Sequence, residues 1–93
     1  MNGVNVRATK DQINEFLESI LWKDIKRELG AWKTGFKNEM LNIVSEAENE
    51  NPSSATVLMH MGDIHGRIKA VEYLLELPYV FLQVLEDKTM DKE

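Results

Sequence analysis

Apolar residues recur every three or four positions over two long stretches of this chain, and this spacing places them on one face of a helix. The first stretch runs from Trp22 to Ala47, and the second from Val57 to Leu75. Both predict long amphipathic helices, at about residues 22–49 and 52–77. The residues expected to form the helix contacts are Trp22, Ile25, Leu29, Trp32, Phe36 and Met40 in the first, and Met61, Ile64, Ile68, Val71 and Leu75 in the second.

A shorter helix precedes them, at about residues 9–19. Thr9 and Gln12 have the spacing of a capping box, in which each side chain binds the backbone N–H of the other residue. The apolar spacing of this segment fails between Ser19 and Leu21. The pattern therefore predicts a bend or hinge there.

The polar run 46–54 is the clearest break in the chain. Asn51 can cap the next helix, and Pro52 is tolerated at a first helical position. Pro78 should end that helix at Leu77, because proline lacks the backbone N–H that a helix interior requires. Residues 79–86 would form a further short helix. Residues 1–8 and 87–93 are expected to be flexible, which leaves a single domain over 9–86.

These elements predict an all-α fold. Two long helices joined by a short polar link form an antiparallel hairpin, which the short helices flank. Apolar residues outside the two main faces, among them Leu41, Val44 and Leu58, would stay exposed in such a hairpin. We therefore expect the chain to associate with itself into a larger helical bundle.

The charge and composition of the chain disfavour some classes of partner. The 93 residues include 16 acidic and 11 basic side chains, and the net charge of −5 disfavours nucleic acid as a partner. A small DNA-packaging or regulatory protein stays an alternative, because basic residues gather in the first long helix. No apolar run is long enough for a membrane span, and the N-terminus lacks the apolar region of a secretory signal, so we expect a cytoplasmic location and no membrane partner. The chain has no cysteine, so neither a disulfide nor a thiolate zinc site is available. The basic residues are Lys23, Lys26, Arg27, Lys33 and Lys37.

The run Gly62-Asp63-Ile64-His65-Gly66 resembles the first metal-binding motif of the calcineurin-like metallophosphoesterases. The resemblance implies that Asp63 and His65 bind metal ions and that a strand precedes them. Residues 67–93 contain no His, Asn or Gly, so the later ligands of such a two-metal site are missing.

A helix accounts better for residues 62–66, because the apolar spacing of the long helix continues through them without a break. Asp63 lies four residues before Arg67, which suits an ion pair on a helix surface, and Gly62 and Gly66 would allow a neighbouring helix to approach. We therefore predict no catalytic residue, no cofactor and no metal site. A metal-dependent phosphoesterase fragment that uses Asp63 and His65 is kept as an alternative.

Two further segments carry a second resemblance. The first is Trp22-Lys23-Asp24-Ile25, at the start of a long helix. The second is Gly66-Arg67-Ile68, in a predicted helix that ends with Leu74-Leu75-Glu76-Leu77-Pro78. Together with the polar turn between them, they resemble small helical-hairpin proteins of tailed bacteriophages. The resemblance implies a virion or head-assembly component that binds copies of itself or a larger viral structural protein. Its location would be the host cytoplasm or the virion.

Overall fold

The computed structural model describes residues 5–50 and 54–91, and these form three α-helices and no strand. Helix α1 spans Lys10–Leu17, α2 spans Ile20–Glu50 and α3 spans Ser54–Asp91. The all-α prediction is confirmed. Asn51 and Pro52, predicted to open the last long helix, lie outside the described residues.

The start of α1 is fixed by the predicted capping box. The Thr9 hydroxyl accepts a hydrogen bond from the backbone N–H of Gln12 at 3.1 Å, and the Gln12 side chain accepts one from the N–H of Thr9 at 2.9 Å. Two N–H groups that a helix start leaves unpaired are satisfied in this way.

A single serine makes the corner between α1 and α2. The Ser19 hydroxyl donates to the carbonyl of Phe16 at 2.6 Å and accepts from the N–H of Trp22 at 3.1 Å. It therefore pairs backbone groups of both helices, which explains why the helical spacing fails here. Because Ser19 acts as a cap, α2 begins at Ile20, two residues earlier than predicted.

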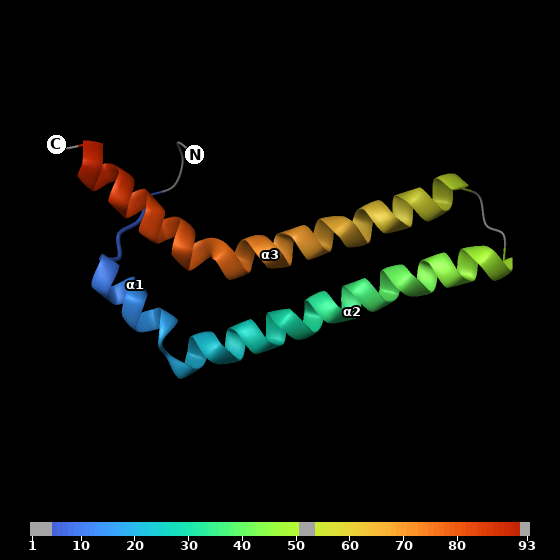
Figure 1. Ribbon diagram of the computed structural model, residues 1–93, viewed down its shortest axis with the longest axis horizontal. Coiled ribbons are helices and arrows are strands. Elements are labelled where there is room, and N and C mark those ends of the chain that lie inside the picture. The colour runs from blue at the N-terminus through green and yellow to red at the C-terminus, as the bar shows by residue number, and fades with distance from the viewer. Residues whose placement is uncertain (1–4, 51–53, 92–93) are drawn as a thin grey trace.

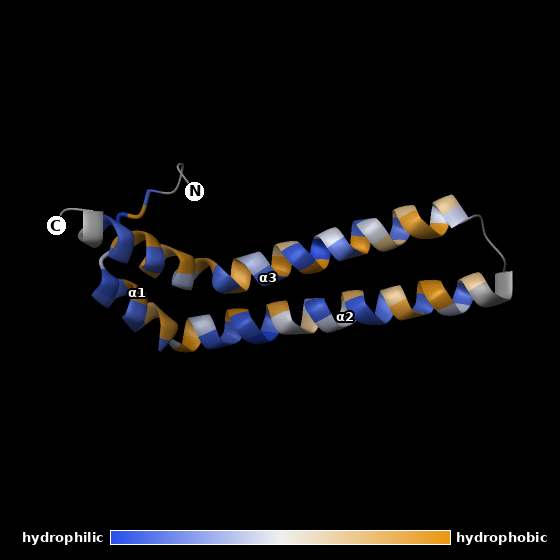
Figure 2. Ribbon diagram, turned by 45° about the horizontal axis from the view of Figure 1, so that its top comes forward, coloured by the Kyte–Doolittle hydropathy of each residue, from blue (hydrophilic) through white to orange (hydrophobic). Residues whose placement is uncertain are grey.

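Helices α2 and α3 lie antiparallel, side by side, with α1 packed at the end far from their connection (Figure 1). Apolar segments line the sides on which the two long helices face each other, and they continue into the junction of α1 with α2 (Figure 2). The buried apolar residues are Ile13, Trp22, Ile64, Ile68 and Val71.

Pro78 does not end a helix, so the predicted stop at Leu77 and the separate helix 79–86 were wrong. α3 continues through Pro78 to Asp91 and changes direction in its orange part (Figure 1). Proline removes one N–H bond, and its ring pushes against the carbonyl four residues earlier, here Leu74, which kinks a helix without always breaking it. The bend lays the last turns of α3 along α1, where Pro78 is buried.

Trp32 also differs from its predicted position. Its side chain is 51% exposed, and its indole N–H donates to Glu28 at 3.0 Å within α2. The neighbouring Lys33 instead turns toward α3, where its ammonium lies 3.8 Å from the carboxylate of Glu72. Contrary to the prediction from its spacing, Trp32 is therefore not buried between α2 and α3.

Candidate interaction surface

Asp63 lies on the surface of α3, where it forms the predicted pair with Arg67. The two side chains meet at 2.8 Å, and each is more than half exposed. The guanidinium of Arg67 also lies over the ring of Phe36 in α2, 5.9 Å from its centre. Asp63 thus helps to orient a cation against an aromatic ring of the neighbouring helix, a contact worth about 0.5–1 kcal/mol at an exposed site.

The geometry that a phosphoesterase motif requires does not form. Residues 57–61, which would have to be a strand, belong to α3. His60 and His65 are both exposed, and within residues 5–50 and 54–91 no three His, Cys, Asp or Glu side chains are grouped so that they could hold a metal ion. The alternative that uses Asp63 and His65 therefore has no structural support.

Gly62 and Gly66 face open space. A Cβ atom added at either residue would find no neighbouring atom within 4 Å. The predicted close approach of a second helix at these glycines is therefore not made within the described chain. No close helix contact among the described residues offsets the cost of these glycines, which is about 1 kcal/mol each relative to alanine in a helix interior.

Gly66→Ala is accordingly expected to raise the free energy of unfolding by up to about 1 kcal/mol, because the added methyl group meets no clash and restricts the unfolded chain. Urea unfolding followed by circular dichroism would measure the change. The matched control is Ala70→Gly, at an exposed position one turn later, which should lose a similar amount. A loss of stability in Gly66→Ala would instead reveal a backbone packed against this glycine.

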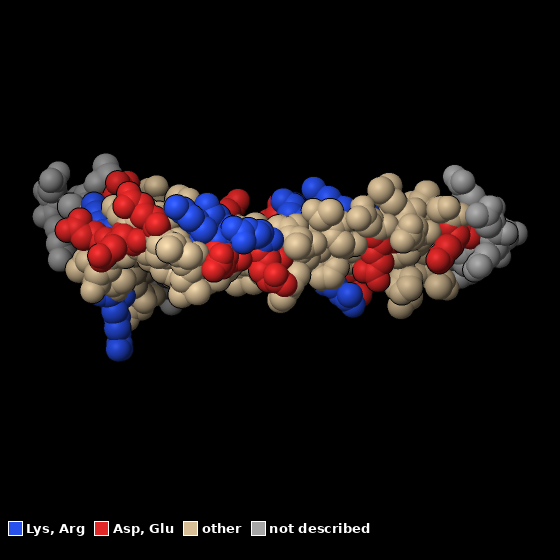
Figure 3. Space-filling view, turned by 90° about the horizontal axis from the view of Figure 1, so that it is seen from below, with Lys and Arg blue, Asp and Glu red and all other residues tan. Residues whose placement is uncertain are grey.

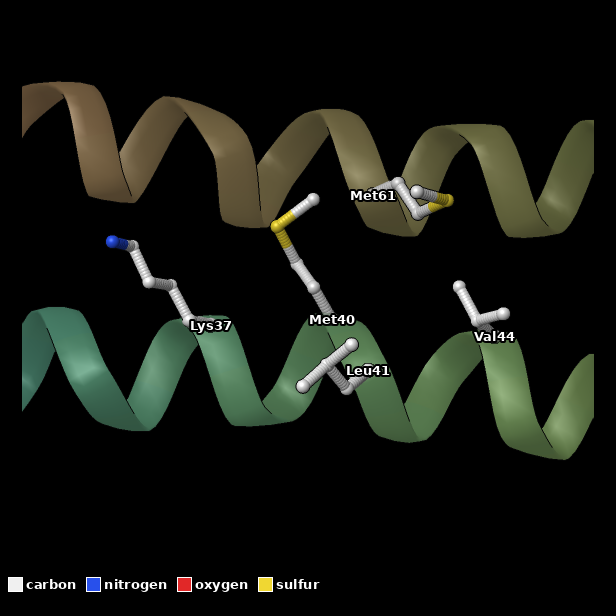
Figure 4. A pocket seen from close by; sticks show the side chains of 5 residues that line it. All are labelled: Lys37, Met40, Leu41, Val44 and Met61. Atoms are coloured by element: carbon white, nitrogen blue, oxygen red, sulfur yellow. The ribbon is translucent and has the colours of Figure 1, made fainter.

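A shallow groove of about 400 Å³ opens between α2 and α3, in the half of the molecule near their connection. In Figure 4, Met40 reaches from α2 toward α3, Met61 lies opposite on α3, and Leu41 lies over α2 itself. We call this the α2–α3 groove. Its lining residues are Lys37, Met40, Leu41, Val44 and Met61.

The apolar side chains near the groove are open to solvent. Leu41, which lines it, is 68% exposed, and Leu58, one helical turn from Met61 on α3, is 69% exposed. Seen from the α2 side, charged side chains gather over α1 and the start of α2, whereas uncharged side chains cover a larger share of the half near the α2–α3 connection (Figure 3). Flexible methionine side chains suit a surface that adapts to another apolar surface. The groove can therefore bind apolar side chains.

Two of the five basic residues of α2 are paired with acidic side chains. Arg27 lies 3.7 Å from Asp24, and Lys33 lies 3.8 Å from Glu72. These pairs place acidic side chains among the basic ones, which weakens any attraction for phosphate groups.

Comparison of the chain with protein families, with curated proteins and with solved structures found no match. Among the described helices, none is long and apolar enough to cross a membrane.

The predicted contact residues divide into three groups by burial, and the largest group is half-buried: Ile25, Leu29, Phe36, Met40, Met61 and Leu75. Trp22, Ile64, Ile68 and Val71 are buried within the chain, so they stabilise the monomer and are closed to a partner. Trp32 is exposed. The most exposed large apolar side chains lie outside that predicted set: Ile20, Leu21, Leu41, Leu58 and Met59. In the sequence, the last four can be recognised as leucines or a methionine that fall off the main apolar faces of the two long helices.

Proposed function

We propose that this chain is a non-catalytic interaction protein that works by assembling with copies of itself. The observation that carries the proposal is the accessible surface of 7285 Å². A compact monomer of 10.7 kDa would expose only about 5,500 Å². The excess of roughly 1,800 Å² exceeds the ~800 Å² that each partner buries in an interface of standard size.

The shape of the molecule explains the excess. The Cα atoms extend over 60 × 31 × 14 Å, and their radius of gyration is 18.7 Å, compared with about 12 Å for a compact domain of this length. The long helices thus form a single layer, whereas stable domains pack at least two layers around a core. A second layer, supplied by another chain, would cover the exposed apolar side chains.

The resemblance to helical-hairpin proteins of tailed bacteriophages gives this proposal a more specific form. A virion or head-assembly component would bind copies of itself or a larger viral structural protein. The antiparallel arrangement of α2 and α3 and the apolar surface near their connection support such a role.

Light scattering over a concentration series tests the proposal. We expect a discrete oligomer at micromolar concentration, with a mass that is a small multiple of 10.7 kDa. Dissociation on dilution should reduce the helix content, because part of the apolar surface of each hairpin would lose its cover. A stable monomer throughout the series would contradict the proposal.

A further inference from the structure

We infer that the α2–α3 groove is the docking site for a second copy of this chain, which packs with its α2 antiparallel to the first. The inference rests on the proposed self-assembly and adds the face and the orientation. Both follow from the exposed side chains around the groove and from the distribution of charge along α2.

Exposed apolar side chains of both long helices lie in or within one helical turn of the groove lining. Leu41 and Val44 of α2 and Leu58 of α3 are 68%, 43% and 69% exposed. Met40 and Met61 form the floor between them. When the same patch of two copies meets across a two-fold axis, each copy covers the apolar side chains of the other, and the assembly closes as a dimer.

The charges of α2 select the orientation. Residues 22–37 contain five basic and two acidic side chains, whereas residues 38–50 contain four acidic and no basic ones. A parallel second copy would place like charges side by side. An antiparallel copy instead places Lys37 of each α2 near the acidic segment 45–50 of the other, and such complementarity favours this register and speeds association.

The two-fold axis then passes near Leu41. Lys37 of one copy lies close to the acidic end of the other α2, where Glu46 is exposed. The apolar patch lies at the middle of this contact and the charges lie toward its edges. Protein interfaces have this arrangement of an apolar centre and a polar rim.

Leu41→Glu tests the face, with Leu21→Glu as the matched control. Leu21 lies in the same helix and is 62% exposed, but it lies outside the groove. A carboxylate at residue 41 would be buried against its own copy at the two-fold axis, so the dissociation constant of the dimer should rise at least about 30-fold, as for a central hot spot. Analytical ultracentrifugation measures the constant. Circular dichroism at high concentration checks that each variant remains helical.

A distance measurement tests the orientation. The chain contains no cysteine, so Lys23→Cys provides a single attachment site for a spin label. In the antiparallel dimer the two labels would lie about 50 Å apart, since each is 18 residues from the axis at a rise of ~1.5 Å per residue. A distance below about 25 Å would show a parallel arrangement and overturn the inference.

The outcomes separate this inference from the proposed function. If the wild type forms an oligomer and Leu41→Glu dissociates while Leu21→Glu does not, the groove is the docking site. If the wild type forms an oligomer that Leu41→Glu leaves intact, the inference fails and the proposed self-assembly stands. If the wild type is a monomer at every concentration, both fail.

Discussion

Trp22→Ala is expected to lower the free energy of unfolding by about 3–5 kcal/mol, the range for a buried tryptophan. Trp22 is 4% exposed, and its ring packs against Phe16 of α1 with the ring centres 5.3 Å apart and the planes at 45°. The substitution removes this contact and leaves a cavity at the corner where the helices meet. The substitution breaks no hydrogen bond of the Trp22 side chain, because its indole N–H is buried without a partner in the described chain.

The loss should be largest for α1, whose Phe16 rests on the indole ring. Limited proteolysis should therefore cut Trp22→Ala between residues 9 and 19 before it cuts α2 or α3. Because domains of this size are stable by only about 5–15 kcal/mol, the variant should be partly unfolded at moderate temperature.

Trp32→Ala is the matched control, since it removes the same side chain from the same helix. Trp32 is 51% exposed and loses only its surface hydrogen bond to Glu28. Its free energy of unfolding should change by less than about 1 kcal/mol. Equal losses in the two variants would mean that Trp22 is not the anchor of the corner.

Ile64→Ala is expected to lower the free energy of unfolding by about 2–5 kcal/mol. Ile64 is the most buried apolar side chain among the described residues, at 1% exposed, and it lies in the contact of α3 with α2. The substitution opens a cavity in a thin core, which has no second layer to relax into the space. The better helix propensity of alanine returns only a few tenths of a kcal/mol.

Ile20→Ala makes the same chemical change at a position that is 77% exposed. It should alter the free energy of unfolding by no more than about 0.5 kcal/mol. Urea unfolding followed by circular dichroism compares the two variants through their midpoints. A small effect in Ile64→Ala would show that the contact of α2 with α3 contributes little to stability.

The pairing of Asp63 with Arg67 illustrates how far local rules reach. A separation of four residues in a helix brings two side chains together whatever the rest of the fold does, so the sequence predicts this contact and the structure confirms it. The capping box of Thr9 is local in the same sense. The resemblance to the phosphoesterase motif does not extend to its structure, because five residues do not specify the strand that must precede them.

Trp32 and Lys33 show where local rules stop. After Leu29, a residue three or four positions further along can lie on the same face before Phe36, so the spacing allows either one. The choice depends on α3, which presents Glu72 to Lys33. A chain pattern carries no information on which side chain the opposite helix offers.

The sequence by itself determined that the fold is helical, where α1 starts, and that the chain turns near Ser19, because helix periodicity, caps and breaks act over a few neighbouring residues. Only the tertiary structure decided that α3 continues through Pro78. There the bend places the last turns of α3 on α1, and this packing offsets the loss of one backbone hydrogen bond. It also decided which apolar residues stay exposed, since burial depends on how many helices surround each face, and here a single layer leaves the α2–α3 groove open.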